Sequence, residues 1–231
     1  MKIGRLCAVL PLKPFDDAKE RLATGLGPAA RRTIARAMAT DVITELLEFE
    51  RVGETVIVSA EPSIGELAGD RASAVLPDAR TGHSDAAGAG VTWALAHGCD
   101  SVLMVPGDCP LIDRDQIDGL IERCERESIE VAVVPDRMGS GTNALLLTPP
   151  DAIAPAFGPG SRERHLALGR DAGRNTAAIT VPSLALDLDT ADDLLELAER
   201  IGAGGHRALN TEQAIASLLT DRHKLPGGYA R

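Results

Sequence analysis

Three aspartates lie where a cation could be bound. Asp108 comes directly after the apolar run Val102 to Val105 and the Pro-Gly pair that ends it. Asp187 and Asp189 alternate in LALDLDTADDL, so in an extended chain their side chains point to the same side. Mg²⁺ favours oxygen ligands and uses few carboxylates beside phosphate oxygens. We therefore predict that Asp108, Asp187 and Asp189 bind Mg²⁺, with a turn at Asp108 and a helix cap at Asp189 as the structural alternatives.

A basic segment near the N-terminus is the second candidate group. LPLKPFDDAKERLA carries Lys13, Lys19 and Arg21 directly after an apolar run. In an open α/β sheet, ligands bind outside the carboxyl ends of the strands, and cations there can neutralise triphosphate oxygens. The segment lacks the P-loop pattern, and a solvated charged loop would have the same composition.

Glycines and neutral hydrogen-bond donors gather in two further segments. DRMGSGTNALLL contains Thr142 and Asn143, and FGPGSRERHL contains Gly158 and Ser161. Glycine permits close approach of the backbone to a ligand, and Ser161 stands at an expected helix N-terminus, which favours a phosphate or carboxylate. The range 136–161 is expected to form loops and one strand beside the ligand, although glycine and proline also make ordinary turns.

Alternating strand and helix patterns supply the scaffold for these residues. They indicate βαβ units and an α/β fold with a mostly parallel sheet. The expected strands are Leu6–Leu10, Thr55–Ser59, Val102–Val105, Val131–Val134, Ala144–Leu147 and Ala177–Val181. The expected helices are Pro28–Leu47, Asp85–His97, Asp113–Glu127 and Thr190–Ile201. In the first of them, Ile34, Met38, Val42 and Leu46 recur every four residues. Asp113 and Thr190 are the expected caps at the starts of the last two. We expect one domain over 1–202 and a C-terminal extension over 203–231, containing a short helix near 211–219 and a loosely held tail.

Composition excludes several classes of protein. The chain has three Phe, one Trp and one Tyr, and a net charge of −10 with scattered basic residues, so nucleic acid and anionic membranes are not expected partners. No apolar run has transmembrane length and the start lacks a signal-peptide pattern, which predicts a cytoplasmic protein. The four cysteines form no C-x-x-C pair and are expected to be buried thiols. No G-x-S-x-G motif accompanies the five histidines, which disfavours a serine hydrolase.

Five segments follow one another in a characteristic order: LPLKPFDDAKERL, VPGDCPL, DRMGSGTNALLL, FGPGSRERHL and LALDLDTADDL. This order resembles the 2-phospho-L-lactate/phosphoenolpyruvate guanylyltransferase family of coenzyme F420 biosynthesis, over nearly the whole chain up to about Arg200. The resemblance implies a single-domain, Rossmann-like, GT-A-like nucleotidyltransferase fold with helices flanking a mixed sheet. It also implies that Thr142, Gly158 and Ser161 bind the acceptor, that Asp108, Asp187 and Asp189 bind the metal, and that Gly88 in RTGHSDAAGAGVTWAL contacts the nucleotide.

The resemblance implies transfer of GMP from GTP to the phosphate of phosphoenolpyruvate, 2-phospho-L-lactate or 3-phospho-D-glycerate, with release of diphosphate. The attacking oxygen is already anionic, so alignment and charge neutralisation by Lys13, Lys19, Arg21 and Asp108 should suffice without a strong base. Lys13 and Lys19 would also hold the nucleotide. The alternatives are a nucleotidyltransferase of the same fold acting on a sugar phosphate or molybdopterin, and a non-catalytic nucleotide-binding regulatory protein. A homodimer is compatible with the sequence.

Overall fold

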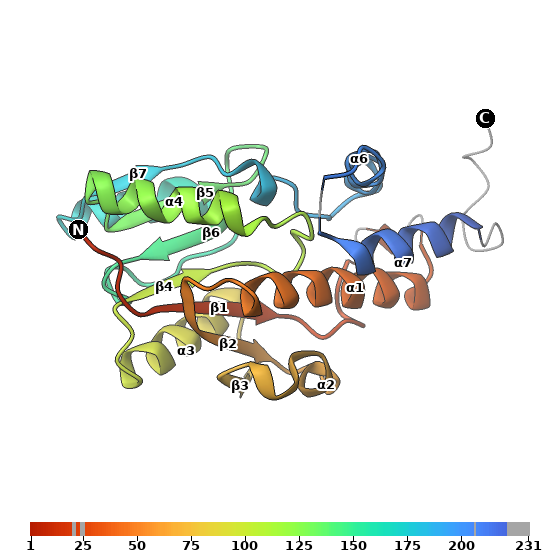
Figure 1. The fold of residues 1–231 in the computed structure, drawn as a ribbon, viewed down its shortest axis with the longest axis horizontal. Coiled ribbons are helices and arrows are strands. Elements are labelled where there is room, and N and C mark those ends of the chain that lie inside the picture. The colour runs from red at the N-terminus through yellow and green to blue at the C-terminus, as the bar shows by residue number, and fades with distance from the viewer. Residues whose placement is uncertain (20–21, 24–25, 206, 221–231) are drawn as a thin grey trace.

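A mixed β-sheet runs through the centre of the protein (Figure 1). The computed structural model describes residues 1–19, 22–23, 26–205 and 207–220. The strands in these ranges are β1 (Leu6–Leu12), β2 (Val52–Ser59), β3 (Ala74–Pro77), β4 (Ser101–Met104), β5 (Val131–Pro135), β6 (Thr142–Leu147) and β7 (Thr176–Ala178). They form one seven-stranded sheet in the order β3-β2-β1-β4-β6-β5-β7. Only β6 is antiparallel to its neighbours in these ranges, which confirms the mostly parallel mixed sheet.

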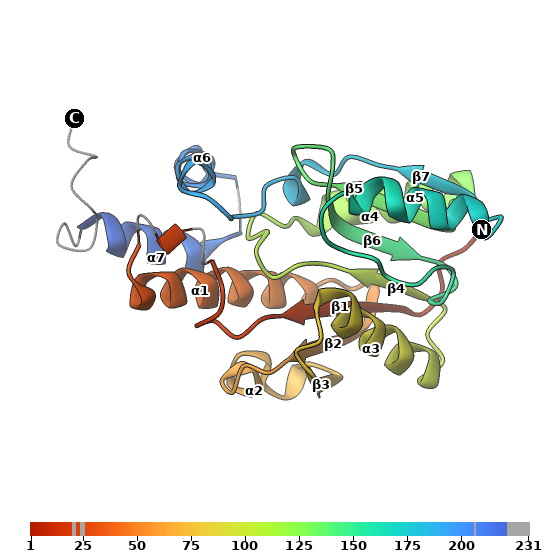
Figure 2. The same ribbon diagram turned by 180° about the vertical axis from the view of Figure 1, so that it is seen from behind.

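Helices cover both faces of this sheet. They are α1 (Pro28–Leu47), α2 (Ile64–Ala68), α3 (His83–Ala96), α4 (Arg114–Glu127), α5 (Ser161–Asp171), α6 (Ala191–Gly202) and α7 (Leu209–Thr220). α1 and α4 lie on one face, and α3 and α5 lie on the other (Figures 1 and 2). α6 and α7 lie beyond the end of the sheet toward which β1 runs (Figure 1). None of the helices in the described ranges is both long and apolar enough to span a membrane.

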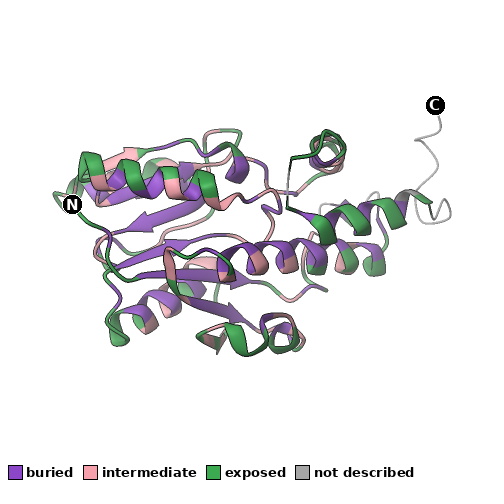
Figure 3. Ribbon diagram, in the orientation of Figure 1, coloured by how far each residue is buried: buried purple, intermediate pink, exposed green. Residues whose placement is uncertain are grey.

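Apolar side chains on both faces of the central strands form the core. All seven residues of β1 are buried, as expected for a strand covered by helices on both sides. On α1, Ile34, Met38, Val42 and Leu46 are buried, which confirms the predicted repeat. Figure 3 shows the same division on α4 and α7, whose inner sides are buried and outer sides exposed. The four cysteines are free and buried, as predicted.

Several element ends differ from the prediction. No element was expected over 60–77, where the structure has α2 and the short edge strand β3. β7 ends at Ala178 rather than at the predicted Val181, and a 3₁₀ turn that begins at Pro182 follows at Pro182–Leu184. Both predicted helix caps are confirmed: the Asp113 carboxylate accepts hydrogen bonds from the N–H groups of Asp115 and Gln116, and Thr190 forms a capping box with Asp193.

The C-terminal helix α7 packs on α1 and is anchored by a buried carboxylate. The predicted helix near 211–219 is α7, whereas the predicted tail over 221–231 lies outside the described residues. Asp41 on α1 is 2% exposed. It accepts hydrogen bonds from Asn210 N (3.0 Å), Asn210 Nδ2 (2.7 Å), Thr211 N (2.8 Å) and Thr211 Oγ1 (2.6 Å). These donors lie in the first turn of α7, so the Asp41 carboxylate on α1 caps the N-terminus of α7.

Replacing Asp41 with asparagine is expected to lower the free energy of unfolding by about 2 to 3 kcal/mol, because hydrogen bonds to a buried charged acceptor are lost and an amide N–H₂ faces backbone donors. Urea denaturation of the full chain measures this loss. The exposed Asp70→Asn variant has the same charge change and should unfold like the unsubstituted protein. Equal stability of the two variants would mean that Asp41 does not anchor α7.

Candidate active site

A cavity of about 640 Å³ opens where β1 and β4 end and where the antiparallel strand β6 begins. Its lining brings together most of the residues predicted to carry function: Lys13, Lys19, Asp108, Thr142, Gly158, Ser161, Asp187 and Asp189. Arg21 lies outside the described residues. Gly88 lies within α3 and lines neither this cavity nor the smaller one beside it. The sequence segments that seemed separate therefore form one site at the carboxyl end of the sheet, where ligands bind in open α/β folds.

A buried lysine lies between two of the three predicted metal ligands. Lys19 Nζ is 2.6 Å from Asp108 Oδ2 and 3.3 Å from Asp189 Oδ1, and the lysine side chain is only 6% exposed. Burial works against the positive charge, but the two carboxylates outweigh it and hold the pKa of Lys19 above its usual value. Burial likewise opposes the charge of Asp108, and Lys19 holds the pKa of that carboxyl below its usual value. This ammonium group is therefore a fixed cation within the acidic cluster.

The backbone places Asp108 beside the Asp187–Asp189 segment. A Cβ at Gly107 would lie 2.0 Å from Leu12 Cδ2, so glycine lets the chain pass this close to the Leu12 side chain before Asp108 without displacing it. Leu188 N then donates a hydrogen bond to Asp108 O at 3.2 Å. Since Leu188 stands between the two other aspartates, this bond brings the Asp187–Asp189 segment beside Asp108.

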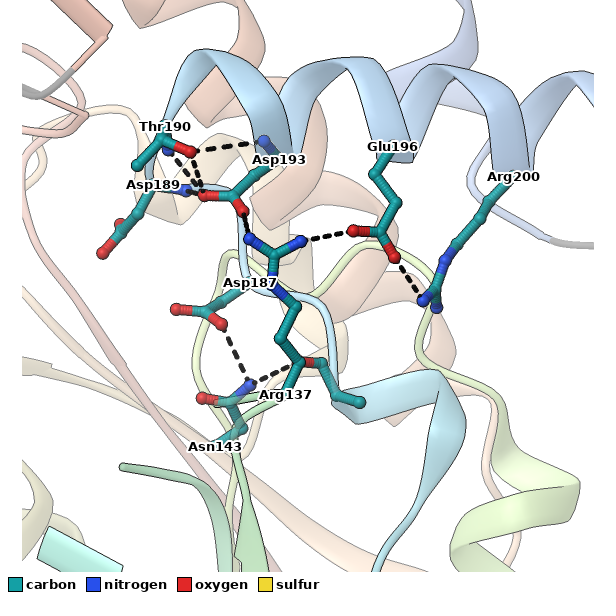
Figure 4. A network of polar contacts seen from close by, with 9 residues as sticks. Arg137, Asn143, Asp187, Asp189, Thr190, Asp193, Glu196 and Arg200 are labelled. Carbon is teal, nitrogen blue, oxygen red and sulfur yellow. Dashed lines mark hydrogen bonds and ion pairs between the residues drawn. The ribbon is translucent and has the colours of Figure 1, made fainter. Parts of the chain in front are cut away.

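Side chains from β6 and α6 orient the same segment (Figure 4). Asn143 Nδ2 donates hydrogen bonds to Leu184 O (2.8 Å) and Asp187 Oδ1 (3.2 Å). Asn143 thus points toward Asp187, a candidate metal ligand, and supports it. The sequence did not indicate this contact. Its amide fixes one carboxylate oxygen of Asp187.

The helix-cap alternative for Asp189 does not hold. Thr190 is the N-cap of α6, and Asp193 Oδ2 accepts hydrogen bonds from Asp189 N (3.0 Å) and Thr190 N (2.7 Å). Arg137 forms ion pairs with Asp193 and Glu196, which fixes Asp193 in turn (Figure 4). The Asp189 carboxylate lies instead beside Lys19 and lines the cavity.

The opposite wall of the cavity is formed by the two glycine-bearing segments. Gly158 has φ +109°, a conformation that side chains disfavour, and it leads into α5 at Ser161. Ser161 is buried and lines the cavity. Thr142 Oγ1 is 3.0 Å from His165 Nδ1, and Ala156 N donates a hydrogen bond to His165 Nε2 at 2.8 Å. His165 was not among the predicted site residues, although it lies one helical turn after Ser161.

A second cavity of about 280 Å³ adjoins the first. It is lined by residues at the ends of β1 and β3 and the start of α3, and it shares Lys13 and His83 with the larger cavity. Lys13 has no ion-pair partner among the described residues, so its ammonium is available to an anion lying across the two cavities.

The acidic residues of the cavity are the candidate ligands for a divalent cation. Within the described ranges, no three carboxylate, histidine or cysteine side chains gather closely enough to form a metal site as they stand. The Lys19 ammonium lies between Asp108 and Asp189 and supplies a positive charge at the place where the sequence predicts a metal. Burial and the neighbouring Asp108 raise the pKa of Asp187. Asp108, Asp187 and Asp189 offer the oxygen ligands that a hard divalent cation prefers, but in the described ranges they are not gathered into a preformed metal site.

The chain is similar to known proteins over most of its length. The family described as "Guanylyl transferase CofC like" matches residues 6–208. A phosphoenolpyruvate guanylyltransferase of Conexibacter woesei is 39% identical over 218 residues, covering 94% of this chain and 98% of that protein. A 2-phospho-L-lactate guanylyltransferase of Methanothermobacter thermautotrophicus is 31% identical over 196 residues, covering 84% of each chain.

Solved structures show the same fold at low sequence identity. A putative nucleotide-diphospho-sugar transferase from Desulfovibrio desulfuricans superposes with a TM-score of 0.76 and 14% identity, covering 93% of this chain and 95% of that one. A 4-diphosphocytidyl-2C-methyl-D-erythritol synthase superposes with a TM-score of 0.61 and 13% identity, covering 84% and 96%. The single-domain nucleotidyltransferase fold is thereby confirmed, and the extent of the family match shows that this chain belongs to the CofC-like guanylyltransferase family.

Proposed function

We propose that this protein transfers the GMP group of GTP to the phosphate of a small phosphorylated C3 acid, with phosphoenolpyruvate as the first choice of acceptor. The observation that carries this proposal is that one cavity is lined both by the Lys19–Asp108–Asp189 cluster and by the neutral donors Thr142 and Ser161. Relatives named for phosphoenolpyruvate reach 39% identity and one named for 2-phospho-L-lactate has 31%, which favours phosphoenolpyruvate. The guanylylated product would serve coenzyme F420 biosynthesis.

In the proposed reaction, an oxygen of the acceptor's phosphate attacks the α-phosphorus of GTP. A new P–O bond joins the two phosphates, the bond between the α- and β-phosphates breaks, and diphosphate leaves with that electron pair. The attacking oxygen is already anionic, so no general base has to remove a proton. The protein's task is to hold the two anionic substrates in line and to neutralise charge.

The two cavities suggest where each substrate lies. Lys13 faces both, so we assign the triphosphate to the space beside Lys13 and the base to the smaller cavity. Thr142, Gly158 and Ser161 form the opposite wall of the larger cavity and are assigned to the acceptor. The acidic cluster with Lys19 borders the same larger cavity, where the α-phosphorus and the attacking oxygen meet.

Mg²⁺ is the proposed metal, and Asp108, Asp187 and Asp189 are the residues that would hold it. When bound, it would neutralise phosphate oxygens of both substrates and lower the barrier to their approach. Asn143 would orient Asp187, and the Asp193–Arg137 pair would orient Asp189. Lys19, which lies between Asp108 and Asp189, would stabilise the leaving diphosphate.

The test is a matrix of acceptors and nucleotides. The protein with Mg²⁺ is incubated with each of four NTPs and with phosphoenolpyruvate, 2-phospho-L-lactate, 3-phospho-D-glycerate or a sugar phosphate, and the products are identified by mass. A guanylylated phosphoenolpyruvate with equimolar diphosphate is expected. A product formed only from a sugar phosphate would refute the proposal in favour of another nucleotidyltransferase of the same fold. Binding of GTP with no product from any acceptor would refute it in favour of a non-catalytic nucleotide-binding protein.

Replacing Ser161 with alanine is expected to raise the KM for the acceptor by roughly ten- to a hundredfold, since one hydrogen bond to a charged group is lost. The KM for GTP should change little, while kcat should fall somewhat because the same donor aligns the attacking oxygen. Separate titrations of acceptor and GTP measure the two effects, with the exposed Ser217→Ala on α7 as control. A defect confined to the GTP titration would show that the substrates are assigned the wrong way round.

A further inference from the structure

We infer that His165 is a positioning residue that fixes the hydroxyl of Thr142 as a hydrogen-bond donor toward the anionic group of the acceptor. The inference rests on the proposed function, because it names how one side of the acceptor site is set. His165 is fully buried, and its two ring nitrogens have different partners. Each partner restricts what the other nitrogen can do.

The partner of Nε2 decides which nitrogen carries the proton. Ala156 N lies 2.8 Å from His165 Nε2, and a backbone N–H can only donate. Nε2 must therefore present its lone pair, and in a neutral ring the proton lies on Nδ1. Burial, with a smaller contribution from Arg164, lowers the pKa of His165 to about 4, so the ring is neutral near pH 7.

The proton on Nδ1 decides the role of Thr142. Nδ1 is 3.0 Å from Thr142 Oγ1 and donates to it. The threonine hydroxyl has one proton to give, and this proton cannot point back at a donor. No other partner of the Thr142 hydroxyl occurs in the part of the chain that the structure describes, and Thr142 lines the larger cavity. The hydroxyl proton is thus directed into the cavity, where a phosphate or carboxylate oxygen would accept it.

The same ring also joins the two glycine-bearing segments that form the acceptor wall. Its hydrogen bonds connect Ala156, just before the glycine loop, with Thr142 at the start of β6. Phe157 packs edge-on against it, with ring centroids 5.1 Å apart. Anchoring the loop and orienting the hydroxyl are separate roles, because each uses a different nitrogen.

Two substitutions separate these roles. The carboxamide of His165→Asn reaches the place of Nδ1, where its N–H₂ can donate to Thr142 but leaves the N–H of Ala156 without an acceptor. The longer His165→Gln reaches the place of Nε2, where its oxygen can accept from Ala156 N while Thr142 loses its donor. A purely structural role would make His165→Asn the more harmful change, and a positioning role makes His165→Gln the more harmful one.

The expected result is that His165→Gln raises the KM for phosphoenolpyruvate about tenfold with the KM for GTP unchanged, whereas His165→Asn stays within about threefold of the unsubstituted protein. Adding Thr142→Ala to His165→Gln should cost little more, because both changes remove the same oriented donor. Additive losses, or a larger acceptor defect in His165→Asn, would overturn the inference.

A spectroscopic measurement tests the ring without relying on turnover. In protein labelled with ¹⁵N-histidine, the nitrogen shifts of His165, assigned by comparison with His165→Gln, should show the proton on Nδ1 at pH 7. A proton on Nε2 overturns the inference even if the enzyme is active. A proton on Nδ1 in a protein that guanylylates no acceptor would instead refute the proposed function, and the acceptor role of Thr142 with it.

Discussion

Replacing Asp108 with asparagine is expected to lower kcat by on the order of a thousandfold while the protein stays folded. Asn keeps the volume and one oxygen of the aspartate but removes the charge that pairs with Lys19 and that would hold Mg²⁺. The backbone bond from Leu188 N to Asp108 O does not involve the side chain, so the local chain path is kept. Diphosphate release from GTP and phosphoenolpyruvate at saturating Mg²⁺ measures the loss.

A matched control distinguishes the loss of the charge at Asp108 from the loss of one negative charge elsewhere in the protein. Asp151→Asn makes the same change on an exposed loop residue outside the cavity and should retain full kcat. Urea denaturation of both variants shows whether the fold persists. Turnover of Asp108→Asn near that of the control would rule out Asp108 as a metal ligand.

Replacing Lys19 with methionine is expected to have two opposite effects. Turnover should fall on the order of a hundredfold or more, because the leaving diphosphate loses a cation. Binding of a divalent cation to the substrate-free protein should become tighter, since the ammonium between Asp108 and Asp189 no longer competes for the two carboxylates. Calorimetric titration with Mn²⁺ in the absence of nucleotide measures the second effect independently of activity.

Lys13→Met is the matched control for this titration. It removes the same charge from the same cavity, but Lys13 has no carboxylate partner among the described residues. It should therefore change Mn²⁺ affinity less than Lys19→Met does, while raising the KM for GTP. Unchanged or weaker Mn²⁺ binding in Lys19→Met would mean that the lysine does not hold the place of the metal.

The sequence predicted the elements whose signal is long and local. α1 was predicted from Pro28 to Leu47, where a repeat of buried residues continues over many turns. α2 and β3 were missed because α2 is five residues long and β3 is a four-residue edge strand whose side chains are not fully buried on either face. Short elements of this kind depend on the neighbours they pair with rather than on their own pattern.

Most of the predicted site residues line one cavity, but the contacts between them were not predicted. Lys19 was assigned to the triphosphate, whereas in the structure it pairs with Asp108 and Asp189, which are 89 and 170 positions away in the chain. Asn143 was grouped with the ligand donors and instead supports Asp187. His165 could have been added to the candidate site from its spacing. It lies four residues after Ser161, so the two side chains share a face of α5.

Because of the reversed direction of β6, the two sides of the site come from two separate stretches of the sequence. Because β6 runs against β4 and β5, its first residues, rather than its last, reach the edge where β1 and β4 end. The wall assigned to the acceptor is therefore encoded by one continuous stretch, 136–165, and the wall assigned to the triphosphate by the loop after β1. On this assignment, substitutions within 136–165 are expected to change which acid is accepted, whereas substitutions in the loop after β1 are expected to change the KM for GTP.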